Sequence, residues 1–215
     1  MLIAGKSLWL AETNCWVIAP EAGGPGVLID APPDPAGVMS LLAEHNVTPV
    51  ALLLTHGHID HTGGAGVVVG TADIDAYVHP DDDYLTLDPL GQLRMLFGMV
   101  PPGDFSPPTR RVQIGDRQVL HVAGIDLEVV HTPGHTPGHC CFLVRSEGVL
   151  FSGDHLFAGS VGRTDLPGGD YNTLIESMRS KVLPLDDQVL VYPGHGPTTT
   201  LARERRTNPF LQELI

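Results

Sequence analysis

The feature that most constrains this fold is an apolar run that ends abruptly in a cluster of polar side chains. Residues 50–54 are all apolar, and the next positions read Thr55-His56-Gly57-His58-Ile59-Asp60-His61. A short apolar run that meets polar residues and glycine predicts a buried strand followed by a tight turn. The sequence therefore predicts three imidazoles and a carboxylate at the carboxyl end of a strand.

The side chains of this first motif are of the types that bind transition metals. Imidazole nitrogen and carboxylate oxygen coordinate zinc, and also iron and manganese. A structural zinc site favours a closed set rich in thiolates, and no cysteine lies near residues 55–61. The motif therefore favours a reactive metal site over a structural one.

Three further candidate ligands follow apolar runs later in the chain. His135 lies in Thr-Pro-Gly-His-Thr-Pro-Gly, Asp154 follows Phe-Ser-Gly, and His195 lies in Tyr-Pro-Gly-His-Gly. Glycine lets the backbone approach a metal closely and proline fixes the turn, so each side chain can be aimed at one point. Together with the first motif they supply five histidines and two aspartates, enough for two metals that share a ligand.

The order of apolar and helical patterns predicts an α/β fold with two sheets. Nine short apolar runs have strand length: residues 15–19, 27–29, 50–54, 76–78, 119–122, 127–130, 140–144, 149–151 and 189–192. Four segments have helical spacing or composition: residues 35–45, 84–99, 172–183 and 199–206, with Asp170 as the cap of the third. Strands in clusters with helices in both halves predict two packed sheets with helices outside, within one domain of 215 residues.

Composition limits the classes of binding partner and the cellular compartment that we expect for this chain. A net charge of −13 with only 12 Lys and Arg leaves no basic surface for nucleic acid. No apolar stretch reaches the length of about 18 residues that a membrane span needs, and no secretion signal opens the chain. The odd set Cys15, Cys140 and Cys141 implies no disulfide framework, so we expect small core residues in a cytoplasmic, membrane-free protein.

The motifs, in their order, resemble those of the metallo-β-lactamase-fold hydrolases, at residues 55–61, 132–136, 153–154 and 194–196. The resemblance covers nearly the whole chain, and it implies a four-layer αββα sandwich with the site between the loop edges of the two sheets. It also implies a ligand set for each of two metals. His56, His58 and His135 would bind the first metal, Asp60, His61 and His195 the second, and Asp154 would bridge them.

Within that superfamily, residues 159–165, 167–170 and 204–210 resemble the short bacterial glyoxalase II-like enzymes, which are similar to hydroxyacylglutathione hydrolase. The resemblance implies two divalent cations, zinc first and iron or manganese as alternatives, and a small-molecule thioester such as S-lactoylglutathione as substrate. Full-length enzymes of that family have a helical C-terminal region that contacts glutathione. This chain ends 20 residues after His195, so we expect a single domain over residues 1–215, with the thiol carrier left open.

This interpretation gives roles besides metal binding to four residues. Asp60 would orient the attacking hydroxide. Asp30, at the end of an apolar run, is either a carboxylate that holds a ligand imidazole in its tautomer or the start of a turn. Arg163 and Arg205 are either contacts for substrate carboxylates or ordinary solvated arginines.

Other titratable residues near the motifs are expected to have structural roles. We expect His139 and His155 to be packing groups or to support the ligands without binding the metals. Three successive acids at residues 81–83 precede a predicted helix, and the helix dipole explains them.

An alternative function from another class is a persulfide dioxygenase with a single iron held by two histidines and an aspartate. Such enzymes resemble this family and share its first motif. Their last motif carries alanine before the histidine and aspartate after it, whereas this chain has Gly194 and Gly196 at those positions. The last motif therefore favours the hydrolases.

Overall fold

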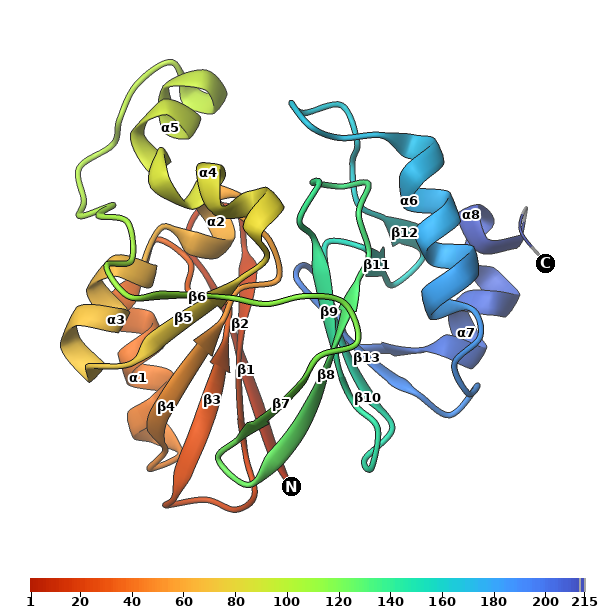
Figure 1. Ribbon diagram of the computed structural model, residues 1–215, viewed down its shortest axis with the longest axis horizontal. Helices are drawn as coiled ribbons and strands as arrows, with labels where there is room; N and C mark the ends of the chain where they lie inside the picture. The colour runs from red at the N-terminus through yellow and green to blue at the C-terminus, as the bar shows by residue number, and fades with distance from the viewer. Residues whose placement is uncertain (213, 215) are drawn as a thin grey trace.

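Two six-stranded sheets form the centre of the molecule in the computed structural model, which describes residues 1–212 and 214 (Figure 1). The first sheet has the order β1-β2-β3-β4-β5-β6, with β3 to β6 parallel to one another. Its strands are β1 (Leu2–Leu8), β2 (Thr13–Ala19), β3 (Pro25–Ile29), β4 (Thr48–Leu53), β5 (Asp75–Val78) and β6 (Arg111–Gln113).

The second sheet has the order β14-β13-β10-β9-β8-β7. Its strands are β7 (Val119–Val122), β8 (Ile125–His131), β9 (Cys140–Val144), β10 (Val149–Gly153), β13 (Leu190–Pro193) and β14 (Thr199–Thr200). A small antiparallel pair, β11 (Leu156–Phe157) and β12 (Ser160–Val161), follows β10. Because β10 and β13 are parallel, their carboxyl ends meet at one edge of the sheet.

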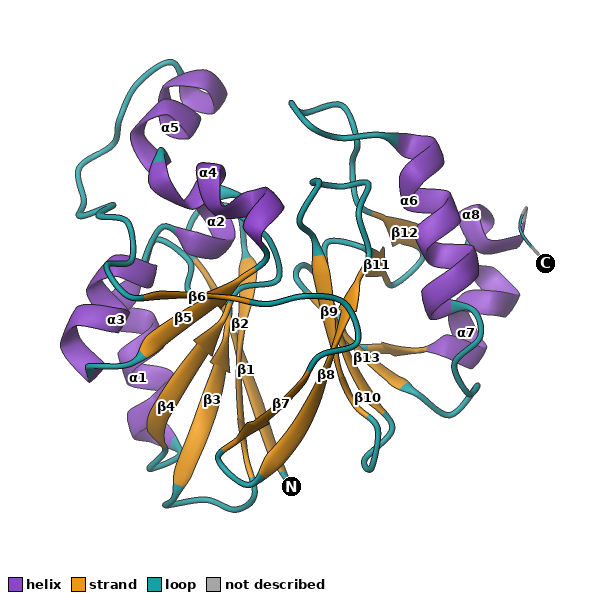
Figure 2. Cartoon of the chain, viewed as in Figure 1, coloured by secondary structure: helices purple, strands orange, loops and turns teal. Residues whose placement is uncertain are grey.

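Helices cover the outer face of each sheet (Figure 2). Those on the first sheet are α1 (Pro35–Glu44) and α3 (Ala65–Ala72), and those on the second are α6 (Tyr171–Ser177), its π-helical continuation η2 (Met178–Val182), α7 (Leu201–Thr207) and α8 (Pro209–Gln212). Four short helices lie toward the loop edge of the sheets: α2 (Ile59–Thr62), η1 (Pro80–Asp82), α4 (Asp83–Leu87) and α5 (Pro89–Phe97). The four-layer αββα sandwich is thereby confirmed. Over the described residues, no helix is long and apolar enough to cross a membrane.

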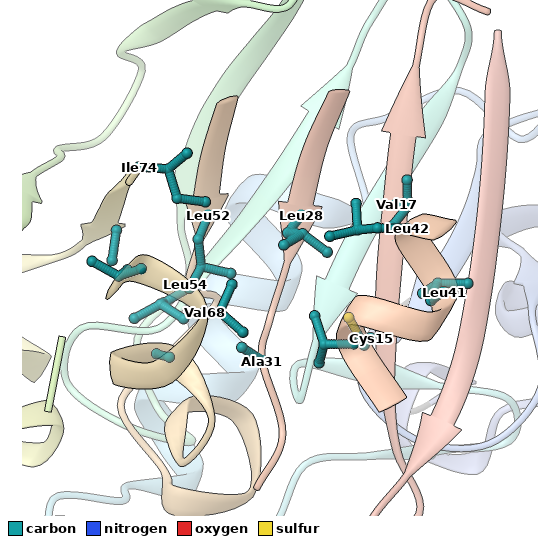
Figure 3. Close-up of a cluster of buried hydrophobic side chains, with 14 of the residues drawn as sticks. Cys15, Val17, Leu28, Ala31, Leu41, Leu42, Leu52, Leu54, Val68 and Ile74 are labelled. Atoms are coloured by element: carbon teal, nitrogen blue, oxygen red, sulfur yellow. The ribbon is translucent and has the colours of Figure 1, made fainter. Parts of the chain in front are cut away.

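The apolar run before the first motif is continuous because β4 is buried on both faces. Successive strand side chains point to opposite sides, so Leu52 packs under α1 and α3 while Leu53 packs between the sheets. Figure 3 shows the cluster under the helices, where Leu41 and Val68 meet the outer face of the first sheet. Burial of each such side chain contributes about 1.5–3 kcal/mol, so the strand that ends at the motif is firmly held.

The three cysteines are buried residues of these cores and form no disulfide. Burial raises the pKa of the Cys141 thiol to about 12 and that of Cys140 well above its ordinary value. Thiols that stay protonated are poor nucleophiles. Their interpretation as small packing residues is confirmed.

Several elements differ from the sequence prediction. The expected helix over residues 84–99 is two helices, because Asp88 caps a new start at Pro89 and Gly98 ends it in a left-handed conformation. Strand β1 was missed because an edge strand that is half exposed carries little apolar pattern. Helix α3, with the sequence AGVVVGTA, was missed because valine and glycine are weak helix formers, and its packing on the sheet overrides that propensity.

Candidate metal centre

The structure brings all seven candidate ligands together at the loop edge shared by the two sheets. The loop after β4 and the following helix α2 carry the four residues of the first motif, on the side of the first sheet. His135 comes from the loop after β8, while Asp154 and His195 directly follow β10 and β13. Each sheet therefore contributes part of the ligand set.

Three imidazole nitrogens converge in the first group. His56 Nε2 lies 3.1 Å from His58 Nδ1, which lies 2.9 Å from His135 Nε2, and His135 Nε2 lies 3.2 Å from His56 Nε2. A neutral imidazole has a single N–H, so a triangle of ring nitrogens leaves lone pairs facing one another. Such a buried arrangement suits a cation at its centre.

A second group lies beside the first. His195 Nε2 is 3.3 Å from His61 Nε2 and 3.2 Å from the Oδ2 atom of Asp60. His61 Nε2 is 3.5 Å from the same carboxylate oxygen. Two imidazoles and a carboxylate thus face one point.

Asp154 lies between the two groups. Its Oδ2 is 3.6 Å from His135 Nε2 and 3.5 Å from His195 Nε2, and its Oδ1 is 3.2 Å from His61 Nε2. Burial alone would raise the pKa of this carboxyl, but the nearby imidazoles, His61 above all, lower it below its usual value. Among the described residues, its buried Oδ1 accepts no hydrogen bond. An ionised carboxylate between two imidazole groups, with one oxygen that accepts no hydrogen bond, is suited to bind a pair of cations.

Two histidines of the first group, His56 and His58, are in the protonation state that metal binding needs. Burial, with repulsion from the other imidazoles, lowers the pKa of His58 to about 3 and that of His56 well below its usual value. Both rings are therefore neutral near neutral pH and keep a lone pair available. The residues present fit two divalent cations in their nitrogen and oxygen donors, their burial and their charge.

Backbone and side-chain acceptors orient the ligand rings. Asp30 is buried and accepts a hydrogen bond from His61 Nδ1 at 2.7 Å, and its other contacts come from the backbone N–H and hydroxyl of Thr55, each at 2.8 Å. His135 Nδ1 donates to the carbonyl of Arg163 at 2.7 Å, and His195 Nδ1 to that of Ala11 at 3.1 Å. Each contact leaves the Nε2 atom directed at the centre.

Close backbone approach explains one glycine of the last motif. A Cβ atom at Gly194 would lie 2.2 Å from Asp154 Oδ1 and 2.6 Å from the His61 ring. Such contacts are too short for any side chain, so the carboxylate can reach its position only beside glycine.

The interpretation of the three acids at 81–83 is wrong for Asp82. This fully buried carboxylate accepts hydrogen bonds from the Gly57 N–H at 2.8 Å, the Thr136 hydroxyl at 2.6 Å and the Gly138 N–H at 2.6 Å. It thus joins the ligand loop of the first sheet to that of the second. Sequence alone could not single it out, because Asp81 beside it has the same chemistry and is exposed.

Gln92 and His139 also support the ligand loops. Gln92, on α5, accepts from the Ile59 N–H at 2.9 Å and donates to the Gly57 carbonyl at 3.0 Å; its role gave no signal in the sequence. His139 Nε2 accepts from the Asp154 N–H at 3.0 Å, which agrees with the supporting role expected for it. His155 is fully buried, and neither of its ring nitrogens has a hydrogen-bond partner among the described residues.

A cavity of about 530 Å³ opens onto the centre. Arg163 lines this cavity, and its guanidinium forms a two-point contact with Asp165 at 2.7 and 2.8 Å. Arg205 does not line it. Its guanidinium contacts the Asp187 carboxylate and the carbonyls of residues 183 and 185, and so links α7 to the loop before β13; the sequence alone leaves both a substrate contact and a solvated arginine open for it.

Comparison with known proteins agrees with this geometry. A family model described as the metallo-beta-lactamase superfamily matches residues 9–195. The hydroxyacylglutathione hydrolase GloC of Haemophilus influenzae is 36% identical over 204 residues, which are 93% of each chain.

Solved structures give the same assignment. The crystal structure of BLEG-1 B3 metallo-beta-lactamase superposes with a TM-score of 0.89 at 36% identity, covering 98% of this chain and 99% of that one. The structure of TTHA1623 in a di-iron-bound form superposes with a TM-score of 0.85 at 38% identity, covering 97% and 100%. This chain therefore belongs to the metallo-β-lactamase superfamily of metal-dependent hydrolases.

Proposed function

We propose that this chain is a binuclear hydrolase that cleaves the thioester of a 2-hydroxyacylated thiol, of which S-lactoylglutathione is an example. The observation that carries the proposal is the pair of ligand groups on either side of Asp154, whose Oδ2 lies near a histidine of each group and whose buried Oδ1 accepts no hydrogen bond among the described residues. The name of the GloC relative supports the thioester as the reacting bond.

His56, His58 and His135 would hold one cation and Asp60, His61 and His195 the other, with Asp154 between them. Two divalent cations so held would supply a hydroxide nucleophile near neutral pH and an electrophile for the carbonyl oxygen. We propose zinc as the resident metal, because imidazole and carboxylate suit it. Iron is the alternative, supported by the di-iron form of TTHA1623.

Asp60 has the geometry of a residue that orients the nucleophile. Its Oδ2 accepts a hydrogen bond from the Thr13 hydroxyl at 3.1 Å, and its side chain reaches the cavity. Burial opposes ionisation, but the imidazoles of His61 and His195 lower the pKa of Asp60 below its usual value. The group therefore stays a carboxylate and can accept the proton of an attacking hydroxide or water as a hydrogen bond.

A thioester suits this cavity better than an amide because a thiolate leaves without a proton. A free thiol has a pKa of about 8.5, so the departing sulfur is a weak base. An amide nitrogen needs a proton donor. Apart from the candidate ligands, the described residues that line the cavity offer only Trp9 and Arg163 as polar side chains, and neither is a general acid near neutral pH.

Opening of a β-lactam ring is a second candidate, favoured by the likeness to BLEG-1. One experiment separates the candidates: metal analysis of the purified protein together with assays on lactoyl thioesters, a β-lactam and a persulfide. We expect two metals per chain and release of lactate. Two metals with lactam opening alone would replace the thioester proposal, and one iron with oxygen uptake on the persulfide would favour the dioxygenase.

A further inference from the structure

The cavity beside the candidate metal centre has an apolar wall built from three separate parts of the chain. Trp9 comes from the turn between β1 and β2, Phe97 from the end of α5, and Phe157 from β11. The rings of Trp9 and Phe97 meet edge to face with their centroids 5.8 Å apart. The Phe157 ring packs against the His195 ring at 5.9 Å. The apolar surface therefore continues up to a candidate ligand.

Leu96, Val161 and Leu166 complete this wall. Leu96 and Phe97 are partly exposed, although they end a helix whose Leu93 is buried in a cluster with Ile59 and Phe105. Exposed apolar side chains that face a cavity are most simply explained by an apolar group bound there.

Positive charge is nearly absent from the cavity. Of the 12 Lys and Arg, all of which the structure describes, Arg163 alone lines it. Asp165 already pairs with one edge of that guanidinium, through Nε and Nη2. Arg94, on the same helix as the apolar wall, lines a different cavity with Asp104 and Pro107. Away from the metal centre, a ligand with free carboxylates would find a single basic side chain here, one that already has an acidic partner, and an unpaired carboxylate is costly to bury.

The size of the cavity indicates which part of the substrate meets the wall. A volume of about 530 Å³ is in the range of pockets that enclose a drug-sized ligand. A short 2-hydroxyacyl group with its carbonyl at the metal centre fills only the floor of such a space. The rest of the cavity is left for the group attached to sulfur.

We propose that the natural substrate carries an uncharged, apolar thiol, and that the wall of Trp9, Leu96, Phe97, Phe157, Val161 and Leu166 binds it. This inference rests on the proposed thioester hydrolysis and names its leaving group. The hydroxide oxygen bonds to the carbonyl carbon, the C–S bond breaks with its electron pair on sulfur, and the hydroxide proton passes to the thiolate or to solvent. The products are a 2-hydroxy carboxylate and the apolar thiol.

The test compares two lactoyl thioesters on the zinc-loaded protein, one of benzyl mercaptan and one of glutathione. Lactate release gives kcat/KM for each, divided by the rate of hydrolysis in alkali to remove intrinsic reactivity. We expect the benzyl ester to be favoured at least tenfold. Equal values, or preference for the glutathione ester, would overturn the apolar thiol but leave thioester hydrolysis standing. Hydrolysis of neither ester would overturn both proposals.

Two variants in α5 test whether the apolar wall is responsible for the preference for the benzyl ester. Phe97→Ser removes a half-exposed ring from the wall, so the fold should be retained. We expect it to lower kcat/KM for the benzyl ester at least fivefold, chiefly through KM, and to leave the glutathione ester nearly unchanged. Leu90→Ser is the control, because Leu90 is exposed to a similar degree on the same helix and lies outside this cavity. An equal loss on both esters, or no loss, in Phe97→Ser would contradict the assignment.

Discussion

At the scale of single residues, the contacts of each side chain near the candidate metal centre indicate its role in the reaction or in stability. Asp60 accepts a hydrogen bond from the Thr13 hydroxyl through Oδ2, and the residue lines the cavity. Asp60→Asn keeps the size of the side chain and removes its charge. We expect turnover of a lactoyl thioester to fall by a factor of about 10²–10⁴. The thermal unfolding midpoint of the variant, measured in parallel, should stay within a few degrees; full turnover would exclude Asp60 from the reaction.

His155 permits a prediction about acid stability. Burial, followed by repulsion from His135, lowers the pKa of His155 to about 3 in the folded protein, whereas an unfolded histidine has a pKa near 6.5. Between these values the unfolded chain binds the additional proton, so the stability that this group contributes above pH 6.5 is lost as the pH falls toward 3. Each pH unit in that window costs up to about 1.4 kcal/mol per histidine.

The variant His155→Phe isolates that contribution. In metal-free protein we expect the free energy of unfolding, measured with urea between pH 6.5 and 5, to fall less steeply than in the unchanged chain, by about 1 kcal/mol per pH unit. The comparison uses slopes, so a uniform change in stability from the larger ring does not affect it. Identical slopes in the two proteins would mean that His155 is not held neutral.

At the scale of elements, the ligand loops depend on contacts between the sheets. The N–H of Cys140, in the second sheet, donates to the Thr55 carbonyl at 2.7 Å, and that of Asn14 donates to the Gly194 carbonyl at 2.7 Å. Asp82, at the end of η1, makes the corresponding link through its side chain. The relative position of His58 and His135 is therefore set by elements that carry no ligand.

Asp82→Asn tests this link. The new amide turns an N–H₂ group toward at least one of the donors that Asp82 now accepts, which are the backbone of Gly57 and Gly138 and the Thr136 hydroxyl. We expect a loss of about 1–3 kcal/mol in the free energy of unfolding. Titration with zinc should show weaker binding to one site per chain, the one nearest His135, while the other keeps its affinity. Asp81→Asn, at an exposed neighbouring position, is the matched control.

The same scale explains how much of the molecule the sequence could predict. The strand before the first motif could be predicted because an uninterrupted apolar run that ends in polar residues is a local signal. The seven candidate ligands were identified because they follow such apolar runs. Strand β1 and helix α3 could not be predicted, because their residue composition does not favour a strand or a helix and both are stabilised by packing on neighbouring elements. Asp82 and Gln92 were missed because their partners are distant in sequence. The contacts of Arg205 with the carbonyls of residues 183 and 185 could not be predicted, because a motif gives a residue type and does not specify which carbonyls its side chain meets.

At the scale of the whole molecule, the candidate ligands tie the two sheets together. His56, His58 and His61 follow a strand of the first sheet, whereas His135, Asp154 and His195 follow strands of the second. Without cations, the ring-nitrogen lone pairs of His56, His58 and His135 face one another across this edge and repel. Bound cations would turn that repulsion into bonds between the sheets.

Removal of the metals should therefore lower stability as well as activity. A ligand present at 100 times its dissociation constant stabilises the folded state by about 2.7 kcal/mol, and at this chain length each kcal/mol moves the unfolding midpoint by about 2–4 °C. Treatment with a chelator followed by dialysis should lower the midpoint by at least about 5 °C, and zinc should restore it. His56→Ala is the matched control: its midpoint should respond to the chelator by a smaller amount, because one ligand of the first group is gone. An unchanged midpoint in a protein that had carried two metals would mean that the sheets hold this edge without them.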